Sequence, residues 1–128
     1  MMTILVTGAT GFVGTSLVQK IANLYDVVIL TRIQNALLPD TVQQCIKENI
    51  FEADFPKSID VVIHLAGRAH ILNDQSADPL TDFRKVNVEG TLQLAQQALD
   101  KKVKRFIFIS SIGVNGAITF DQPFSEST

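Results

Sequence analysis

The sequence has few of the features that would point to a secreted, membrane-spanning or nucleic-acid-binding protein. It has one cysteine, Cys45, in 128 residues, which excludes an internal disulfide and fits a reducing cytoplasm. Its 11 basic and 13 acidic residues give a net charge of −2 and form no basic run, so no nucleic-acid partner is expected. No apolar run approaches the roughly 20 residues that cross a bilayer, and no targeting signal is visible. We therefore expect a soluble cytoplasmic protein with no membrane partner.

Apolar residues make up 46% of the chain, enough for a sizeable core in one domain. Short apolar runs predict strands at 4–6, 27–30, 61–65 and 106–109, and a less apolar run predicts another at 42–46. Runs that are apolar throughout indicate strands buried on both faces, as in a parallel sheet covered by helices. With right-handed crossovers, the sequence predicts an α/β fold of Rossmann type, a doubly wound parallel sheet.

Two helices are expected between these strands, the first opened by the stretch of residues 7–14 and the second from about residue 78 to about residue 101. Apolar residues at three- and four-residue spacing predict the face that each helix turns to the sheet. In the first helix this face is Val13, Leu17, Ile21 and Leu24. In the second helix it is Phe83, Val86, Gly90, Leu94 and Ala98.

The turn after the first expected strand carries three glycines, because residues 7–14 read Thr-Gly-Ala-Thr-Gly-Phe-Val-Gly. In such a turn the first glycine, Gly8, permits a tight bend, and the second, Gly11, lets a pyrophosphate approach the backbone. The third, Gly14, lets the helix pack closely on the sheet. The helix N-terminus adds free N–H groups and a positive dipole end. Because the pattern lies between a strand and a helix, it predicts a binding site for NAD or NADP rather than an empty turn.

The end of the second expected strand bears on which cofactor is bound. Folds of this kind that bind NAD usually place an acidic residue there, against the ribose hydroxyls. This chain has Thr31 and Arg32 instead, and Asp26 lies at the other end of the strand. Arg32 favours NADP, because a guanidinium pairs with a 2′-phosphate. As alternatives, Arg32 is a solvated loop residue or stacks on the adenine of either cofactor.

Four segments carry a family resemblance: residues 7–14, 60–67 (Asp-Val-Val-Ile-His-Leu-Ala-Gly), 87–91 (Asn-Val-Glu-Gly-Thr) and 108–116 (Phe-Ile-Ser-Ser-Ile-Gly-Val-Asn-Gly). In this order the sequence resembles the extended short-chain dehydrogenase/reductase family, particularly its nucleotide-sugar epimerase and dehydratase branch. The segments span nearly the whole chain. They are highly specific for the family and poorly specific for the substrate.

The resemblance implies a dinucleotide site at the carboxyl ends of the strands. The residues implied to line it are Phe12 and Val13 along the pyrophosphate and Leu65, Ala66 and Gly67 after the fourth strand. Asn49 and Ile50 stand where the family has an Asp-aliphatic pair that contacts adenine, and Asp54 is a rival for that role.

Two side chains would serve the reaction. Ser111, five residues before Gly116, stands where the family places a catalytic Ser or Thr that bonds the reacting hydroxyl or carbonyl. Its spacing alone is also compatible with a polar cap on a strand end. Asn87 is expected either to contact the cofactor or to be a buried amide, satisfied by backbone carbonyls, that holds the active site in shape. Asn115 replaces a frequent tyrosine of the family, a departure that bears on the substrate pocket.

The histidines are interpreted conservatively. His64 is taken as a packed residue at a strand end rather than as an acid or base. His70 and Asp74 lie in a loop within reach of a substrate, but their spacing is not that of metal ligands. No metal site is therefore predicted.

The family's chemistry also needs a Tyr-x-x-x-Lys pair, in which the lysine lowers the pKa of the tyrosine. The one tyrosine, Tyr25, is followed four residues later by Ile29 and cannot be that residue. We therefore expect residues 1–128 to be an NAD(P)-binding Rossmann domain, the N-terminal part of a longer enzyme that is inactive without its substrate-binding C-terminal part.

Several functions stay open at this point. The first is the cofactor-binding portion of an enzyme that takes a nucleotide-sugar, with epimerisation of a UDP-sugar at carbon 4 by transient hydride transfer preferred. Alternatives are NAD(P)-dependent reduction of a 4-keto sugar or other carbonyl, and a non-catalytic dinucleotide-sensing regulator. Without its C-terminal part the domain would expose additional surface, so association into a homodimer is a further open possibility.

Overall fold

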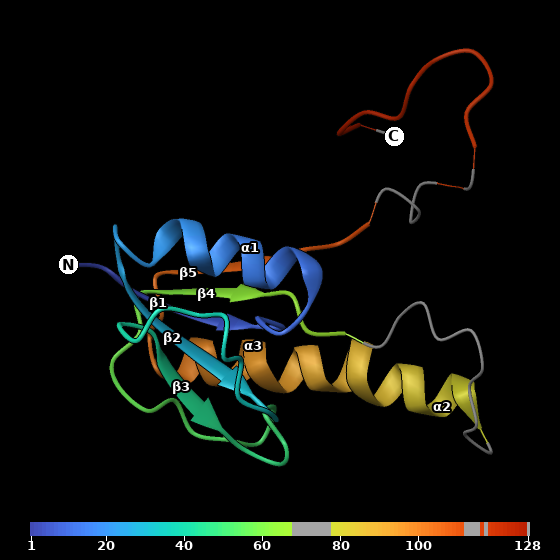
Figure 1. Cartoon of the computed structure of the whole chain (residues 1–128). Helices are drawn as coiled ribbons and strands as arrows, with labels where there is room; N and C mark the ends of the chain where they lie inside the picture. Colours follow the sequence, from blue (N-terminus) through green and yellow to red (C-terminus); the bar gives the residue numbers. More distant parts are fainter. Residues whose placement is uncertain (68–77, 112–115, 117, 128) are drawn as a thin grey trace.

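The computed structural model describes residues 1–67, 78–111, 116 and 118–127. They form a five-stranded sheet in the order β3-β2-β1-β4-β5, and each neighbouring pair is parallel. The strands are β1 (Thr3–Thr7), β2 (Asp26–Thr31), β3 (Gln43–Ile46), β4 (Val61–His64) and β5 (Arg105–Phe108). Helix α1 (Phe12–Ile21) covers one face, and α2 (Pro79–Arg84), the π-helical segment η1 (Lys85–Gly90) and α3 (Thr91–Asp100) run end to end below the other (Figure 1). The predicted doubly wound sheet and each predicted strand are confirmed.

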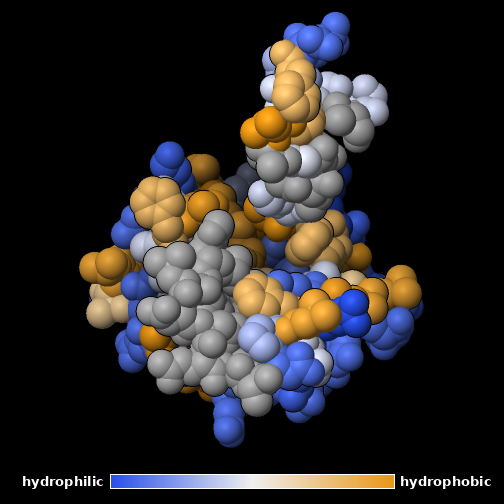
Figure 2. Space-filling model, turned by 90° about the vertical axis from the view of Figure 1, so that its right-hand side faces the viewer, coloured by the Kyte–Doolittle hydropathy of each residue, from blue (hydrophilic) through white to orange (hydrophobic). Residues whose placement is uncertain are grey.

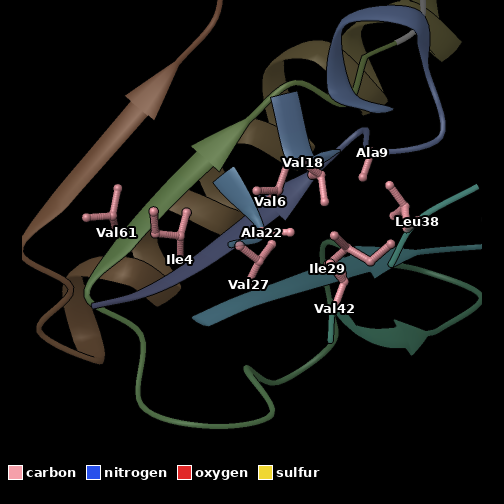
Figure 3. Close-up of a cluster of buried hydrophobic side chains, with 10 residues drawn as sticks. All are labelled: Ile4, Val6, Ala9, Val18, Ala22, Val27, Ile29, Leu38, Val42 and Val61. Carbon is pink, nitrogen blue, oxygen red and sulfur yellow. The ribbon is translucent and has the colours of Figure 1, made fainter. Parts of the chain in front are cut away.

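Each face of the sheet has its own hydrophobic core, because successive residues of a strand point to opposite faces. The core on the α1 face is drawn in Figure 3 and contains Ile4, Val6, Ala9, Val18, Ala22, Val27, Ile29, Leu38, Val42 and Val61. The core on the α3 face contains Leu5, Val28, Leu30, Ile50, Phe55, Ile59, Val62, Leu94 and Ala98. Adjacent strand residues thus go to different cores, which explains why these strands are apolar throughout.

The face that α1 turns to the sheet differs from the predicted one. Its buried residues are Gly14 and Val18, followed by the buried Ala22 at the C-cap. The two ends of the predicted face, Val13 and Leu24, are 58% and 66% exposed, and its middle residues are half-buried. Two neighbouring stripes of one helix can both show three- and four-residue spacing. The stripe with the smaller side chains is the buried one, because it lets the helix lie close to the strands.

The second predicted helix is confirmed, but a π-helical turn lies in its middle, at Lys85–Gly90. On the predicted face Gly90, Leu94 and Ala98 are buried, whereas Phe83 and Val86 are half-buried. Residues four apart drift by about 40° around a regular α-helix. A π turn holds more residues and takes up part of that drift, so the four-residue spacing keeps one face on the sheet.

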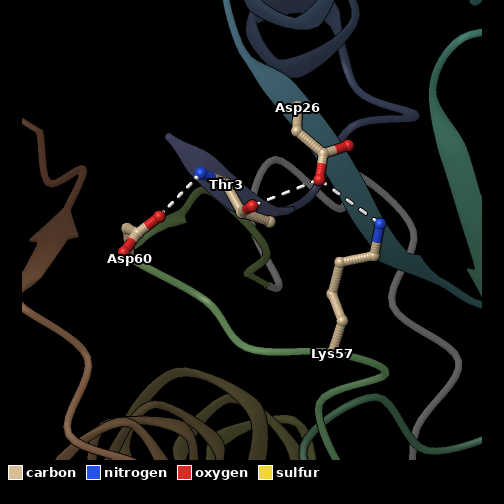
Figure 4. Close-up of polar contacts among 4 residues, drawn as sticks. All are labelled: Thr3, Asp26, Lys57 and Asp60. Carbon is tan, nitrogen blue, oxygen red and sulfur yellow. Dashed lines mark hydrogen bonds and ion pairs between the residues drawn. The ribbon is translucent and has the colours of Figure 1, made fainter. Parts of the chain in front are cut away.

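At the amino ends of the strands, two carboxylates tie β1 to its neighbours (Figure 4). Asp60 accepts from the Thr3 amide at 2.9 Å, and Asp26 accepts from the Thr3 hydroxyl at 3.1 Å. Lys57 pairs with the same oxygen of Asp26 at 3.3 Å. These acidic residues therefore stabilise the fold at the amino ends of the strands, whereas the predicted site lies at the carboxyl ends.

Candidate functional site

The carboxyl ends of β1 and β4 meet at the glycine turn. Gly8 has φ +76°, and a Cβ there would lie 2.6 Å from both the backbone nitrogen of Ala66 and the backbone carbon of Leu65. At Gly14 a Cβ would lie 2.0 Å from the carbonyl oxygen of Gly8. Both positions therefore need glycine for the chain to fold as it does, whatever the turn binds.

Gly11 differs, because the fold itself would accept a side chain there. Its φ of −80° is ordinary, and a Cβ would lie 3.4 Å from the Gly8 oxygen, which is normal contact. It is the N-cap residue of α1, a position where Ser, Thr, Asp or Asn usually caps the helix. Here no side chain caps the helix, and the first turn has no acidic residue. The glycine leaves open space in front of the positive end of the helix.

The first-turn amides of α1 supply unused hydrogen-bond donors at this place. A helix leaves its first N–H groups without partners in its own backbone. Within the described residues, the amides of Phe12, Val13 and Gly14 have no protein acceptor. Beside them opens a surface hollow of about 360 Å³ lined by Thr10, Gly11, Phe12, Thr15, Ser16, Gln19 and Leu37. Bare amides, a helix dipole and free space fit a doubly charged pyrophosphate.

The loop after β4 borders this turn through Leu65 and Ala66. Leu65 and Ala66 are half-buried against Gly8, and Gly67 is exposed. A Cβ on Gly67 would lie 3.2 Å from Oδ1 of Asn87, which belongs to η1. Asn87 is exposed, so it is not the buried amide of the second alternative. Figure 2 looks onto this side of the molecule, where apolar and polar side chains are both exposed.

Behind the turn, three side chains join β1, β4 and α3 in one hydrogen-bonded chain. Thr7 Oγ1 lies 2.6 Å from Nδ1 of His64, and Nε2 of His64 lies 2.9 Å from Thr91 Oγ1. Thr7 Oγ1 also accepts from the amides of Leu65 and Ala66 at 3.2 and 3.1 Å. His64 is fully buried at the end of β4, as the sequence predicted.

His64 makes stability depend on pH, because burial lowers its pKa from 6.5 to about 4. Its hydrogen-bond and ring contacts in the described part of the chain are two hydroxyls and the phenyl rings of Phe51, Phe106 and Phe108. Between about pH 4 and pH 6.5, the two pKa values of His64, this residue is protonated in the unfolded chain and neutral in the folded chain. The stabilisation is complete above pH 6.5 and is lost as the pH falls toward 4.

We expect this histidine to remove about 2 kcal/mol of unfolding free energy between about pH 7 and about pH 5. Urea unfolding at several pH values measures it, with His64→Asn as the matched variant that lacks the imidazole. The variant should show a much flatter profile over this range. The same slope in both proteins would mean that another group causes the loss.

At the end of β2, Thr31 and Arg32 take different roles. Thr31 is buried, and its hydroxyl both donates to the Ile33 carbonyl at 2.6 Å and accepts from the Ile33 amide at 3.3 Å. Arg32 is exposed. The Thr31 hydroxyl therefore shapes the turn, whereas the side chain of Arg32 is exposed to solvent.

Asn35 is a residue of this site that the sequence did not point to. Its side-chain amide is buried and donates to the carbonyl of Ala9 at 3.0 Å and to Thr15 Oγ1 at 3.1 Å. Its Oδ1 accepts from the Leu37 amide at 3.0 Å. Asn35 thereby fixes the loop after β2 to the glycine turn. One asparagine in a loop carries no spacing signal that could have revealed this role.

The residues predicted on the adenine side serve the fold with their side chains. Ile50 is buried in the core of the α3 face, beside Phe55. Asn49 is exposed, and its Oδ1 accepts from the Phe51 amide at 3.0 Å in a tight turn. Asp54 is exposed nearby.

Ser111 is exposed three residues beyond the end of β5, on the carboxyl side of the sheet. His70, Asp74 and Asn115 lie outside the described residues. Among the residues that are described, no group of three His, Cys, Asp or Glu side chains is placed to hold a metal ion. The helices of that part are all too short or too polar to span a bilayer.

A parallel sheet of this strand order, with a glycine turn leading from β1 into α1, defines a Rossmann-type fold. The chain belongs to the NAD dependent epimerase/dehydratase family, whose model matches residues 4–128.

Several of its relatives are epimerases or dehydratases named for a nucleotide-sugar. A UDP-glucose 4-epimerase of Vibrio cholerae is 46% identical, over 88% of this chain and 36% of that protein. A dTDP-glucose 4,6-dehydratase of Haemophilus influenzae is 34% identical, over 100% of this chain and 45% of that protein. The structure of a UDP-glucuronic acid 4-epimerase from Bacillus cereus, in complex with UDP-glucuronic acid and NAD, superposes with a TM-score of 0.81 at 29% identity, over 98% of this chain and 45% of that one. The chain thus spans less than half the length of these relatives.

Proposed function

We propose that this chain binds the pyrophosphate of NAD or NADP at the glycine turn and is the N-terminal, cofactor-binding domain of a UDP-sugar 4-epimerase. One observation carries the proposal: Gly11 leaves the first-turn amides of α1 uncovered although the fold would accept a side chain there. The similarity to the Vibrio cholerae 4-epimerase supports the choice of reaction.

We assign the site residues on the same basis. The proposed cofactor contacts are Gly8, Gly11, Phe12, Val13, Gly14, Thr31, Arg32, Asn49, Ile50, Leu65, Ala66, Gly67 and Asn87. A bound nicotinamide would supply a hydride acceptor for the sugar. The chain's own part is to hold the pyrophosphate on backbone amides, to line the cleft with the loop after β4, and to bond the reacting sugar hydroxyl through Ser111.

Proton transfer from that hydroxyl needs an acid or base that these residues do not provide. We propose that a Tyr-x-x-x-Lys pair beyond Thr128 supplies it, so that residues 1–128 alone bind a dinucleotide without turnover. Because residues 1–128 contain a single cysteine and therefore no internal disulfide, we propose that the protein works in the cytoplasm.

The test is to express the chain together with the coding sequence that follows Thr128 and to assay it with UDP-sugars. An epimerase interconverts the carbon-4 epimers without net consumption of cofactor. A reductase of a 4-keto sugar or another carbonyl consumes one reduced cofactor for each product. A regulator binds the dinucleotide and turns over neither class of substrate. Cofactor consumption or absent turnover would reject the epimerase.

We propose a preference for NADP, based on the exposed guanidinium of Arg32 and the missing acidic residue after β2. Arg32→Ala is expected to weaken NADP binding about tenfold, since a charge-assisted phosphate contact is lost, and to leave NAD binding nearly unchanged. Calorimetry with both cofactors measures this, with Arg105→Ala as control because Arg105 is exposed at the amino end of β5. An equal loss for both cofactors would show that Arg32 stacks on adenine instead.

We further propose that the whole protein pairs with a second copy through the side of η1 and α3 that faces away from the sheet. Val88, Leu92 and Leu99 share one stripe there and are 51%, 64% and 72% exposed. Leu92→Glu is expected to convert a dimer to a monomer in sedimentation velocity, because it places a charge in an apolar contact. Gln93→Glu, one residue further around the helix, is the control and should remain dimeric. A protein that is monomeric without either change would refute the pairing.

A further inference from the structure

His64 is the buried ionisable group that the proposed reaction leaves unused, and its hydrogen bonds determine where its proton lies. A threonine hydroxyl has two lone pairs and one hydrogen. Thr7 Oγ1 accepts from the Ala66 amide at 3.1 Å and, at 3.2 Å, shares the Leu65 amide with the carbonyl oxygen of Thr7. Within the described residues, the one acceptor in contact with the hydroxyl is Nδ1 of His64, at 2.6 Å, so the hydroxyl donates to it. Nδ1 is therefore unprotonated.

The other ring nitrogen carries the hydrogen. A neutral imidazole with an unprotonated Nδ1 has its proton on Nε2. Nε2 lies 2.9 Å from Thr91 Oγ1 and donates a hydrogen bond to it. An imidazolium would instead direct an N–H at the Thr7 oxygen, and the hydrogen of the hydroxyl would then lose the acceptor that it has among the described residues. The ring can satisfy this arrangement in one protonation state only.

This hydrogen-bonded chain sets the geometry in front of it. Thr7 directly precedes Gly8. The hydroxyl of Thr7 accepts hydrogen bonds from the amides of Leu65 and Ala66, and Gly8 packs against these same two residues with no room for a Cβ. This hydroxyl, together with the bond from the Leu65 amide to the Thr7 carbonyl oxygen at 3.1 Å, thus fixes the distance between the end of β1 and the loop after β4. Through Nε2, the same ring also ties α3 to these strands.

We propose that His64, held neutral with its proton on Nε2, is a positioning residue for the dinucleotide site. By accepting a hydrogen bond from the Thr7 hydroxyl, His64 orients the oxygen of that hydroxyl toward the amides of Leu65 and Ala66. It thereby holds the loop after β4 against the glycine turn. The ligand named here rests on the proposed function, but the protonation state does not.

Nitrogen NMR of the unliganded chain, labelled with nitrogen-15 at histidine, tests the protonation state directly. At neutral pH we expect the Nε2–H tautomer for His64, with Nδ1 showing the shift of an unprotonated nitrogen. An Nδ1–H tautomer or an imidazolium at this pH would overturn the proposal. This result is obtained on the unaltered protein, so a variant that fails to fold cannot obscure it.

Three variants test the positioning role by calorimetry with NADP. His64→Phe keeps an aromatic ring beside Phe51, Phe106 and Phe108 but removes the acceptor, and should weaken binding at least tenfold. His64→Asn places an amide oxygen near the position of Nδ1 and should restore most of the affinity. Thr91→Val removes only the partner of Nε2 and should bind within about threefold of wild type.

Amide hydrogen exchange gives a readout that a mere loss of packing would not produce. In His64→Phe, exchange should accelerate at Leu65 and Ala66 more than at Val62 in the middle of β4. If wild type binds NADP and His64→Phe binds it within twofold, His64 is not a positioning residue. If wild type binds neither cofactor, the proposed function fails, while the tautomer and exchange measurements still decide the role of His64.

Discussion

Gly11→Asp is expected to weaken dinucleotide binding about 100-fold or more, equivalent to about 2.7 kcal/mol, without unfolding the chain. The carboxylate would stand where the pyrophosphate is proposed to lie, and its side chain could accept from the first-turn amides of α1 that the ligand needs. Because a Cβ at Gly11 makes only a normal 3.4 Å contact, the substitution does not strain the turn. Calorimetry with NAD and NADP measures the loss.

Thermal unfolding of the same variant separates binding from folding. Aspartate is a good N-cap residue, so the unliganded variant should be as stable as wild type or slightly more stable. Gly11→Asn is the matched control, since it has the same shape and capping ability without the charge. It should lose less affinity than Gly11→Asp. Wild-type affinity in the aspartate variant would show that the ligand does not bind at this helix end.

Gly14→Ala is expected to have the opposite effect and to destabilise the fold by about 4 kcal/mol or more. The new methyl group would lie 2.0 Å from the carbonyl oxygen of Gly8, so a backbone segment must move. That carbonyl also accepts from the Gly11 amide at 3.2 Å, which couples the displacement to the whole turn.

Urea unfolding at neutral pH measures this loss, and Gly11→Ala is the matched control within the same turn. Its methyl group meets only ordinary contact, so its unfolding midpoint should stay close to that of wild type. Should Gly14→Ala prove as stable as Gly11→Ala, α1 would not pack against β1 as closely as the structure shows.

The strands and their order of appearance could be predicted because burial on both faces leaves a direct mark on sequence. Val27 and Val28 belong to different cores, and both must be apolar. The buried side of α1 could not be predicted in the same way. Val13 and Val18 look alike in a periodic pattern, and only the close approach of the helix to β1 makes the stripe through Val18 the buried one.

The candidate site could be predicted where backbone geometry demands a residue type, as at Gly8 and Gly14. Side chains that bond to the backbone were harder to interpret. The sequence shows Thr31 and Asn49 beside the expected cofactor site, but their oxygens bond to Ile33 and Phe51 and shape local turns. Such bonds depend on how the chain turns after each strand, which a single sequence does not state.

The three glycines of the first turn also differ in what natural variation at each would reveal. Gly8 and Gly14 are demanded by the packing of the chain, so any descendant that still folds this way keeps them. Gly11 is free of that demand. In a lineage that abandoned its ligand, Gly11 is the glycine that drift would replace first. Its persistence would record selection for binding, whereas the persistence of its two neighbours would record only the fold.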